Sequence, residues 1–314
     1  MIAPNRKKNL IDFLTRERLS FREKSSLLPY LSFKIGGTAE MAIEASSRKQ
    51  LSSLLDYIHQ HPLPLVLLGG GTNCAFCASH FSGLVVINRS KELKKTGSGR
   101  LYADSGVFTH HLISFARENG LGGLEFLAGI PGTIGGALVG NAGAFNRSIQ
   151  EVVETADLFC PESGIRRVDP DFLEFRYRHS RLKKSGEFLL GITLQVHRRS
   201  PGDIQEEIQS HLQYRRRHHP AYQLPTAGCF FKNPVLRGKK VSAGKLIDEA
   251  GFKGRTQNFL EVSSRHANFI IHHGGADCRD LRKLEDEIVK KVKEIHSLTL
   301  EREVVFISPT GEKY

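Results

Sequence analysis

The chain has 314 residues, of which 39% are hydrophobic and 25% charged, as expected for a globular protein large enough for two domains. No run of 18 apolar residues and no apolar signal segment after Met1 are present, which argues against a membrane span and favours the cytoplasm. The formal net charge of +12 suits nucleic acid, an acidic membrane surface or polyanionic small molecules, although scattered basic residues also serve general solubility.

The spacing of apolar residues predicts alternating short strands and helices. In chain order these are a helical lead-in over 1–28, a strand over 39–45, a helix over 50–61, strands over 65–68, 84–87 and 101–104, and a helix over 108–119. After a glycine-rich segment come strands over 152–159 and 188–196, helices over 203–219 and 242–250, a strand over 268–272, a helix over 280–295 and a strand over 303–307. This mixture predicts an α+β fold with its main boundary within residues 198–224.

Two glycine-rich loops are the most informative segments. The apolar run 65–68 leads into Gly69, Gly70, Gly71, Thr72 and Asn73, and nine glycines lie between Gly120 and Gly143. Backbone N–H groups in such loops bind anions, so two of them suggest a large phosphate-containing cofactor held along its length. Glycine turns with packing roles alone are the alternative. Neither GxGxxG nor GxxxxGK[ST] occurs, which argues against the Rossmann and Walker types of nucleotide site.

The cysteines and basic clusters give weaker signals. Five cysteines in a chain of this length do not indicate a disulfide scaffold. Cys74 and Cys77 have the spacing of metal ligands, but no second pair accompanies them, so no metal is predicted and a zinc or redox role is a minor alternative. The basic clusters lack interleaved aromatic residues, and nucleic acid is therefore not an expected partner.

Three short segments carry polar residues suited to chemistry. Tyr177 and Arg178 lie in FRYRHS, where an arginine can clamp a carboxylate or phosphate. Cys229 follows small residues in AGCFFKNP, a segment that also supplies the hydrogen-bonding side chains of Lys232 and Asn233. Glu303 begins a late strand. A solvent-facing strand, a buried cysteine and a surface strand end are the respective alternatives.

Taken together, the motifs resemble those of a known family. They are KIGG at 34–37, GGGTN at 69–73, GIPGTIGG at 129–136, YRHS at 177–180, GCFFKNP at 228–234, AGKLID at 243–248 and Glu303-Val304. In this order they resemble the UDP-N-acetylenolpyruvoylglucosamine reductase (MurB) family. The short interval between Arg178 and Cys229 resembles its shorter class, type II.

The resemblance implies a fold and a domain division. It implies an FAD-binding fold of the vanillyl-alcohol-oxidase (PCMH) type with a C-terminal α/β substrate-binding domain. The expected division is a helical lead-in over 1–29, an FAD-binding domain of two subdomains over 30–198, and a substrate domain over 199–314.

The resemblance also implies cofactors and site residues. FAD is expected to bind non-covalently, with NADPH as reductant and a UDP-sugar enolpyruvyl ether as substrate. The implied FAD-binding residues are Gly69, Gly70, Gly71, Thr72, Asn73, Gly129, Pro131, Gly132, Thr133, Gly135, Gly136, Asn141 and Ala142. Arg178, Glu303 and Cys229 match catalytic positions, with cysteine where the family usually has serine as the proton donor. Tyr177, Lys232 and Asn233 match substrate positions.

Two other functions remain as alternatives. The first is an FAD oxidoreductase of the same fold with a different small substrate, which would need neither the FKNP segment nor Glu303. The second is a basic nucleic-acid-binding protein without a cofactor. No membrane and no obligate protein partner are expected.

Overall fold

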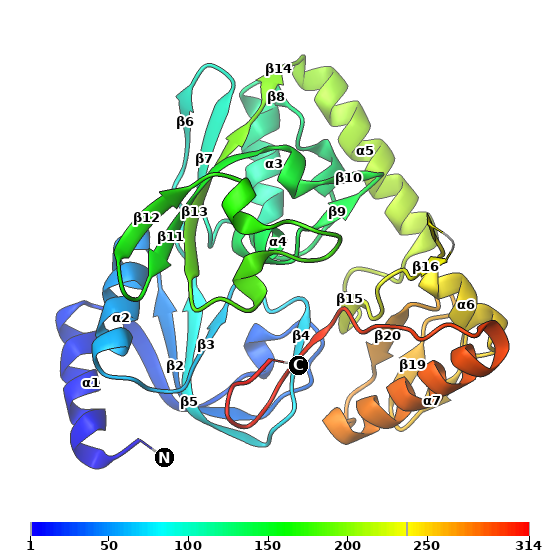
Figure 1. Ribbon diagram of the computed structural model, residues 1–314, viewed down its shortest axis with the longest axis horizontal. Helices are drawn as coiled ribbons and strands as arrows, with labels where there is room; N and C mark the ends of the chain where they lie inside the picture. Colours follow the sequence, from blue (N-terminus) through cyan, green and yellow to red (C-terminus); the bar gives the residue numbers. More distant parts are fainter. Residues whose placement is uncertain (1, 237, 314) are drawn as a thin grey trace. The chain divides into compact units, whose positions relative to one another are not determined.

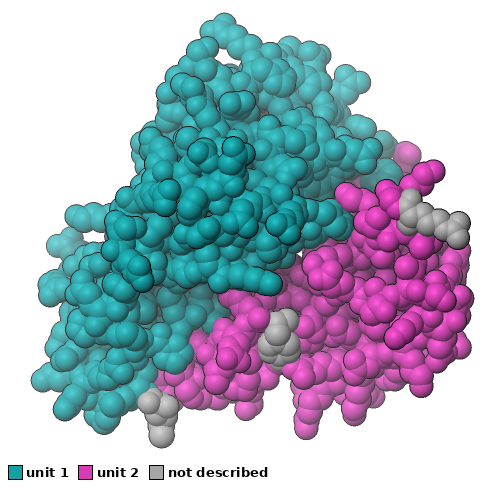
Figure 2. Space-filling view, in the orientation of Figure 1, with its two compact units in different colours: residues 1–23, 41–70, 84–214 teal, residues 24–40, 71–83, 215–314 magenta. Residues whose placement is uncertain are grey.

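The computed structural model describes residues 2–236 and 238–313, which group into two compact units (Figure 1, Figure 2). Unit 1 contains residues 1–23, 41–70 and 84–214, and unit 2 contains residues 24–40, 71–83 and 215–314. The expected division of the chain at residues 29 and 198 assigns each domain a function and stays a prediction, because compact units do not test function. Packing instead groups two early segments with the C-terminal part of the chain.

The first sheet has four strands in the order β1 (Ser20–Ser26), β2 (Thr38–Ala45), β5 (His80–Asn88) and β3 (Leu65–Leu68). β3 and β5 are parallel, with Leu65 opposite Leu84. Helices α1 (Pro4–Arg16) and α2 (Arg48–Gln60) share an apolar core with these strands, because their buried leucines recur at helical spacing. β3 ends at the first glycine-rich loop, so this sheet positions that loop.

The predicted helical lead-in over 1–28 is wrong in its second half. The helix α1 ends at Arg16, and residues 20–26 form β1 at the edge of the sheet. β1 is mostly exposed and its sequence, SFREKSS, is polar on both faces. An edge strand of this kind has almost no hydrophobic periodicity, so the sequence carried no signal for it.

The second sheet, in unit 1, is antiparallel and has five strands. Their order is β12 (Gly164–Val168), β11 (Val153–Cys160), β13 (Phe188–Gln195), β7 (Arg100–Asp104) and β6 (Leu93–Gly97). Helices α3 (Thr109–Glu118) and α4 (Ile134–Val139) pack into the core beside it. The three inner strands were predicted, whereas the edge strands β6 and β12 are rich in exposed lysine or arginine and were not.

Short elements complete unit 1 and the connections. They are β8 (Leu121–Gly122) with β14 (His197–Arg198), β9 (Gly143–Ala144) with β10 (Arg147–Ser148), and the 3₁₀ turns η1 (Leu28–Tyr30), η2 (Glu125–Leu127), η3 (Ile149–Glu151), η4 (Asp171–Leu173) and η5 (Arg181–Lys183). The helix α5 (Pro201–His218) contains the boundary between residues 214 and 215, where the chain passes from unit 1 to unit 2.

Unit 2 contains a third sheet, β15 (Thr226–Cys229), β20 (Phe269–His272), β19 (Leu260–Val262) and β18 (Thr256–Gln257), with helices α6 (Ala243–Glu249) and α7 (Cys278–His296) (Figure 1). It also contains the parallel pair β4 (Cys74–Phe76) and β21 (Val305–Ile307), and the pair β16 (Val235–Leu236) and β17 (Lys239–Lys240). Of the apolar stripe predicted for α7, Leu281, Leu284, Ile288 and Val292 are buried, whereas Ile295 in the last turn is exposed. Among the described helices, none combines the length and apolar character that crossing a bilayer requires.

Candidate active site

The two glycine-rich loops predicted to share one ligand lie against each other in unit 1. A Cβ atom on Gly69, directly after β3, would lie 2.2 Å from Oγ1 of Thr133, so only glycine allows this approach. The Thr133 hydroxyl is already used, because Oγ1 accepts a hydrogen bond from the N–H of Gly136 at 3.4 Å at the start of α4. Gly70 follows Gly69 on the same loop, and this contact supports the prediction that both loops serve one cofactor.

The second loop leaves bare backbone at the surface. Gly129, Pro131 and Gly132 form the turn before Thr133, and Gly135 and Gly136 lie in the first turn of α4. Pro131 and Gly136 are exposed, whereas the Thr133 side chain between them is buried and fixes the loop to the protein interior. Gly129, Gly132 and Gly135 are half-buried, and the N–H groups of Gly135 and Gly136 already donate within the protein, so phosphate binding by this loop stays a prediction.

Sequence reasoning missed the residues that anchor this loop. The N–H of Gly135 donates to the carbonyl of Ser105 at 2.8 Å. The Ser105 hydroxyl donates to the carbonyl of Leu189 at 2.7 Å and accepts from Nδ2 of Asn88 at 2.8 Å. Asn88 and Ser105 are both buried, so the network ties the ends of two strands to the start of α4. The one available signal was polar residues directly after predicted apolar strands.

We expect Gly69→Ala to weaken FAD binding strongly, because the new methyl group must push Thr133 and with it the second loop. Overpacking of this kind costs about 1–3 kcal/mol. The matched control is Gly186→Ala, since a Cβ atom at Gly186 would meet nothing within 4 Å. FAD titration followed by fluorescence, together with thermal unfolding of both variants, measures the difference. Equal FAD affinity in the two variants would show that Gly69 has no part in FAD binding.

The remainder of the first loop belongs to unit 2. Gly71 has φ of +61°, and a Cβ atom there would lie 1.9 Å from the carbonyl oxygen of Tyr30, so glycine is required on both grounds. Thr72 follows, and Asn73 is exposed. Nδ2 of Asn73 donates to the carbonyl of Glu303 at 3.3 Å, and the carbonyl of Asn73 accepts from the N–H of Val305 at 3.0 Å. A predicted cofactor residue is thus bonded to Glu303, a predicted catalytic acid, and to the first residue of β21, which begins at Val305 and not at Glu303 as predicted.

Cys229 and Glu303 share one backbone frame in unit 2. Cys229 ends β15, opposite Phe269 of β20. The next residue, Phe230, accepts a hydrogen bond at its carbonyl from the N–H of Glu303 at 2.8 Å. The side chains of Cys229 and Glu303 are both half-buried. The structure therefore brings together two predicted catalytic residues that are 74 positions apart in the sequence.

Asn268, which the sequence analysis overlooked, holds this frame in place. Its carbonyl accepts from the N–H of Phe230 at 2.7 Å. Its side chain accepts from the N–H of Phe231 at 2.9 Å and donates to the carbonyl of Phe231 at 2.8 Å. Asn268 is buried, so these bonds are shielded from water. A single asparagine at the start of a predicted apolar strand was too weak a signal to detect.

Two histidines next to this frame are kept neutral. The rings of His219 and His266 have centroids 5.3 Å apart. Burial lowers the pKa of His219 to about 4, and burial also lowers the pKa of His266. Nδ1 of His266 accepts a hydrogen bond from the N–H of Asn268 at 3.2 Å. At pH 7 this pair therefore supports the frame without adding positive charge to the basic end of α5.

Lys232 and Asn233 lie beside the same strand, and the contacts seen here are internal. Nζ of Lys232 forms an ion pair with Oε1 of Glu301 at 2.6 Å. Oδ1 of Asn233 accepts from the N–H of Ala243 at 2.9 Å, at the start of α6. Their contact with a substrate stays a prediction.

Arg178 lies in unit 1, on a tight turn. Its φ of +53° is uncommon for a residue with a side chain, so the surroundings must hold it. Nη2 donates to the carbonyl of Gly143 at 3.1 Å, and Nζ of Lys183 donates to the carbonyl of Arg178 at 2.8 Å. The Tyr177 ring, which is exposed, has its centroid 5.4 Å from the Arg178 guanidinium carbon. Arg178 is thus anchored to the C-terminal end of the glycine-rich segment.

Asn141 has a different local role from the one expected of a cofactor ligand. It is buried, and its Nδ2 donates to the carbonyl of Arg176 at 2.9 Å and to Oε1 of Gln150 at 2.8 Å. These bonds hold the turn that carries Arg178. Ala142, whose N–H donates to the carbonyl of Ala137 at 2.7 Å, closes the end of α4. A direct contact of Asn141 or Ala142 with FAD stays a prediction.

Comparison with known proteins then decides the family. Residues 39–169 match the family described as "FAD binding domain", and residues 219–307 match "UDP-N-acetylenolpyruvoylglucosamine reductase, C-terminal domain". The UDP-N-acetylenolpyruvoylglucosamine reductase of Synechococcus sp. (strain JA-3-3Ab) is 36% identical over 291 residues, which is 91% of this chain and 92% of that protein. The chain belongs to the UDP-N-acetylenolpyruvoylglucosamine reductase (MurB) family.

Two further relatives agree with this assignment to the MurB family. The protein of the same name from Chlamydia felis is 34% identical over 288 residues, covering 92% of this chain and 95% of its own length. The crystal structure of UDP-N-acetylenolpyruvylglucosamine reductase (MurB) from Thermus caldophilus has a TM-score of 0.75 at 27% identity, covering 92% of this chain and 98% of that one. The predicted α+β FAD-binding fold with a C-terminal MurB domain is confirmed.

Membership of the MurB family makes this protein an FAD-containing oxidoreductase. The residues present fit such a cofactor, because glycine at position 69 lets the first glycine-rich loop lie directly against Thr133 of the second. The glycine-rich backbone of residues 129–136 lies on the same unit.

The cysteines differ from expectation. Cys77 forms a disulfide with Cys278, 201 residues further along the chain, although no disulfide was predicted. Cys74, the other member of the CxxC pair, is buried in β4, and burial raises the pKa of its thiol to about 12. Within the described residues, no group of three or more His, Cys, Asp or Glu side chains is arranged to hold a metal ion. The number of cysteines does not show which of them lie close together in the fold, so it could not predict this one disulfide.

Proposed function

We propose that this protein reduces UDP-N-acetylglucosamine enolpyruvate to UDP-N-acetylmuramate with NADPH, a step of peptidoglycan precursor synthesis. The observation that carries the proposal is the shared frame of Cys229 and Glu303 beside the FKNP segment, in a chain that also matches an FAD-binding family. A flavin oxidoreductase for another substrate would need no such frame. Bound FAD supplies the redox chemistry, accepting a hydride from NADPH and delivering one to the substrate.

Arg178 is proposed to stabilise the charge that develops on the substrate. When a hydride reaches the terminal vinyl carbon, negative charge spreads onto the adjacent carboxylate. A guanidinium held in advance by Gly143 and the Lys183-anchored turn can meet that charge without reorganising. Arg178 therefore acts on the sugar half-reaction and has no task in the NADPH half-reaction.

Cys229 is proposed to donate the proton that completes the reduction. The hydride adds to one carbon of the double bond, and the Cys229 thiol protonates the other, leaving a thiolate that regains its proton from water. A thiol, with an ordinary pKa of about 8.5, gives up a proton more readily than the serine hydroxyl that is usual in the family. Glu303 faces the same carboxylate in this proposal, so it must be protonated or share a proton to avoid repulsion.

The remaining assignments concern binding and location. Tyr177, Lys232 and Asn233 are proposed to contact the UDP-sugar, whose phosphates also suit the net positive charge. The cytoplasm is the proposed location, since NADPH and the UDP-sugar are cytoplasmic metabolites. Nucleic acid, membrane and obligate protein partners have no part in the proposal.

FAD is expected to bind without a covalent bond, because backbone donors in the glycine-rich loops suffice to hold it. Acid precipitation of the yellow holoenzyme should leave the flavin in the supernatant, where absorbance quantifies it. Flavin that stays in the protein pellet would contradict this expectation, as would a colourless protein that takes up no FAD.

The deciding experiment is an anaerobic one. The holoenzyme is first bleached with NADPH and then mixed with UDP-N-acetylglucosamine enolpyruvate, and the flavin absorbance is followed with time. Rapid return of absorbance with formation of UDP-N-acetylmuramate supports the proposal. Return only with oxygen, and none with the sugar, would favour an oxidase of the same fold.

A further inference from the structure

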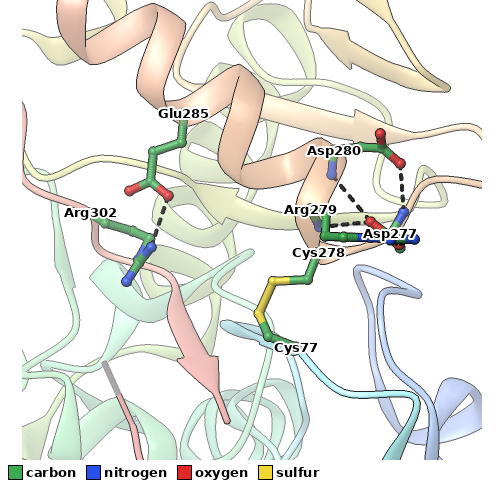
Figure 3. The surroundings of a disulfide bond; sticks show 7 residues. All are labelled: Cys77, Asp277, Cys278, Arg279, Asp280, Glu285 and Arg302. Atoms are coloured by element: carbon green, nitrogen blue, oxygen red, sulfur yellow. Dashed lines mark hydrogen bonds and ion pairs between the residues drawn. A yellow bond between two sulfur atoms is a disulfide. The ribbon is translucent and has the colours of Figure 1, made fainter.

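The disulfide joins two parts of unit 2 that are distant in the sequence. Cys77 lies directly after β4 and Cys278 is the first residue of α7, with Cα atoms 5.1 Å apart (Figure 3). Nothing in the proposed reaction uses either sulfur. The bridge therefore calls for its own explanation.

The bridge connects α7 to the segment that carries site residues. β4 pairs in parallel with β21, and the N–H of Cys77 donates to the carbonyl of Ile307 at 2.8 Å. β21 begins two residues after Glu303, and β4 directly follows the loop residue Asn73. Cys77 is thus connected through one short strand pair to a predicted catalytic residue and to a predicted FAD-binding loop.

A second link between α7 and the same strand does not depend on sulfur. Nη1 of Arg302 contacts Oε2 of Glu285 at 2.8 Å, and both groups are largely buried (Figure 3). Arg302 also stacks over the Phe306 ring, with its guanidinium carbon 3.7 Å from the ring centroid. Breaking the disulfide would leave the Arg302–Glu285 ion pair intact. We therefore expect unit 2 to stay folded while the segment around Cys77 becomes less tightly held.

The two cysteines differ in ways that suit thiol–disulfide exchange. Cys77 is half-buried, whereas Cys278 is buried, so Cys77 is the more exposed residue of the pair. Cys278 lies at the N-terminus of a 19-residue helix, where the helix dipole favours a leaving thiolate. The carboxylate of the preceding residue, Asp277, is paired with Nη2 of Arg279 at 2.7 Å, which limits its opposing charge (Figure 3).

We propose that Cys77 and Cys278 form a reversible thiol–disulfide site whose oxidised state holds FAD more tightly than its reduced state. This inference rests on the proposed cytoplasmic location, because disulfides in that compartment are usually transient or redox-sensing. In reduction, a thiolate of a small dithiol bonds to the Cys77 sulfur and Cys278 leaves as thiolate. The second thiol then releases Cys77, so the dithiol becomes a disulfide and two electrons and two protons pass to the protein. Glutathione disulfide forms the bond again by a separate exchange, in which it takes two electrons and two protons from the protein and leaves as two molecules of glutathione.

The first test counts thiols in the purified holoenzyme. Samples are equilibrated in glutathione buffers from mostly oxidised to mostly reduced, quenched with acid, unfolded and alkylated, and the labels are counted by mass spectrometry. Three labels are expected under oxidising conditions and five under reducing conditions, with Cys77 and Cys278 changing together. A bond that persists in excess reduced glutathione is a static structural link and overturns the proposal. A bond that never forms also overturns it.

The second test measures the consequence for FAD without using the sugar substrate. FAD release after dilution, followed by the rise in free-flavin fluorescence, is expected to be about fivefold or more faster from the reduced protein, the lower end of typical coupling between sites. The melting temperature should fall by about 5 °C. Cys77→Ser and Cys278→Ser should release FAD as fast as the reduced protein, with or without reductant. Cys160→Ala, which lies in unit 1, should still release FAD faster after reduction than before it.

Each outcome is distinguishable from failure of the proposed function. Reversible thiol counts with unchanged FAD release would overturn the coupling, even if the sugar is reduced normally. A redox-dependent FAD release would stand even if the UDP-sugar proved not to be the substrate. If a serine variant does not fold, the redox titration of the unmodified chain still decides the matter.

Discussion

Cys229→Ala is expected to slow the sugar half-reaction by roughly 10²–10⁴-fold, the usual contribution of a positioned acid. The reason is that alanine keeps the β15 frame, set by Asn268, and removes only the proton donor. The NADPH half-reaction and FAD content should be nearly unchanged, since neither needs this proton. Anaerobic stopped-flow absorbance of the flavin measures both half-reactions separately.

The controls separate acid catalysis from packing. Cys229→Ser should recover much of the lost rate, because the hydroxyl occupies the same place and serine is usual in the family. Cys160→Ala removes a buried thiol of unit 1 and should stay active. A thiol-alkylating reagent should inactivate the enzyme, and bound substrate should protect it. Near-normal reoxidation in Cys229→Ala would make the thiol a packing residue, with water or another side chain as the acid.

Arg178→Ala and Arg178→Lys should both lower the sugar half-reaction by about 10²–10³-fold, as found when one preorganised donor is removed. Lysine keeps the positive charge but cannot form the two parallel hydrogen bonds that a planar guanidinium makes with a carboxylate. Reduction of the flavin by NADPH should remain nearly intact, because negative charge develops on the carboxylate only in the second half-reaction. Single-turnover kinetics under anaerobic conditions give both rates.

The neighbouring Arg176 offers a matched control for Arg178. Arg176 is exposed on the same turn, and the hydrogen bonds found for it within the turn and to Asn141 use its backbone. Arg176→Ala should therefore change the rate little. Equal losses in both half-reactions of Arg178→Ala would instead assign Arg178 to folding or to the flavin site.

The candidate site could be predicted in its parts but not in its assembly. The glycine-rich loops, Arg178, Cys229 and Glu303 each stand out locally, by composition or by motif. Their supports did not, because Asn268, Ser105 and Asn88 act through hydrogen bonds to backbone that is far away in the chain. A single buried asparagine or serine looks the same in sequence whether it anchors a loop or faces solvent.

The fold shows the same division. Inner strands such as β7, β11 and β13 bury one or both faces and therefore carry a hydrophobic pattern. Edge strands such as β1 and β6 bury few side chains. Their polar residues protect the sheet edge from pairing with other chains, and they produce no hydrophobic pattern by which a strand could be predicted. In the five-stranded sheet, prediction from periodicity therefore finds the three inner strands and misses the two edge strands.

By itself, the sequence determined the local features: amphipathic helices such as α7, buried strands, bare glycine loops and the motifs that indicate a flavin reductase. These depend on neighbours a few positions apart, where spacing and side-chain chemistry suffice. Only the tertiary structure decided that β4 lies beside β21 and that Cys77 meets Cys278. It also decided that Gly69 touches Thr133. Such contacts depend on how distant segments bury a common core, which no local pattern encodes.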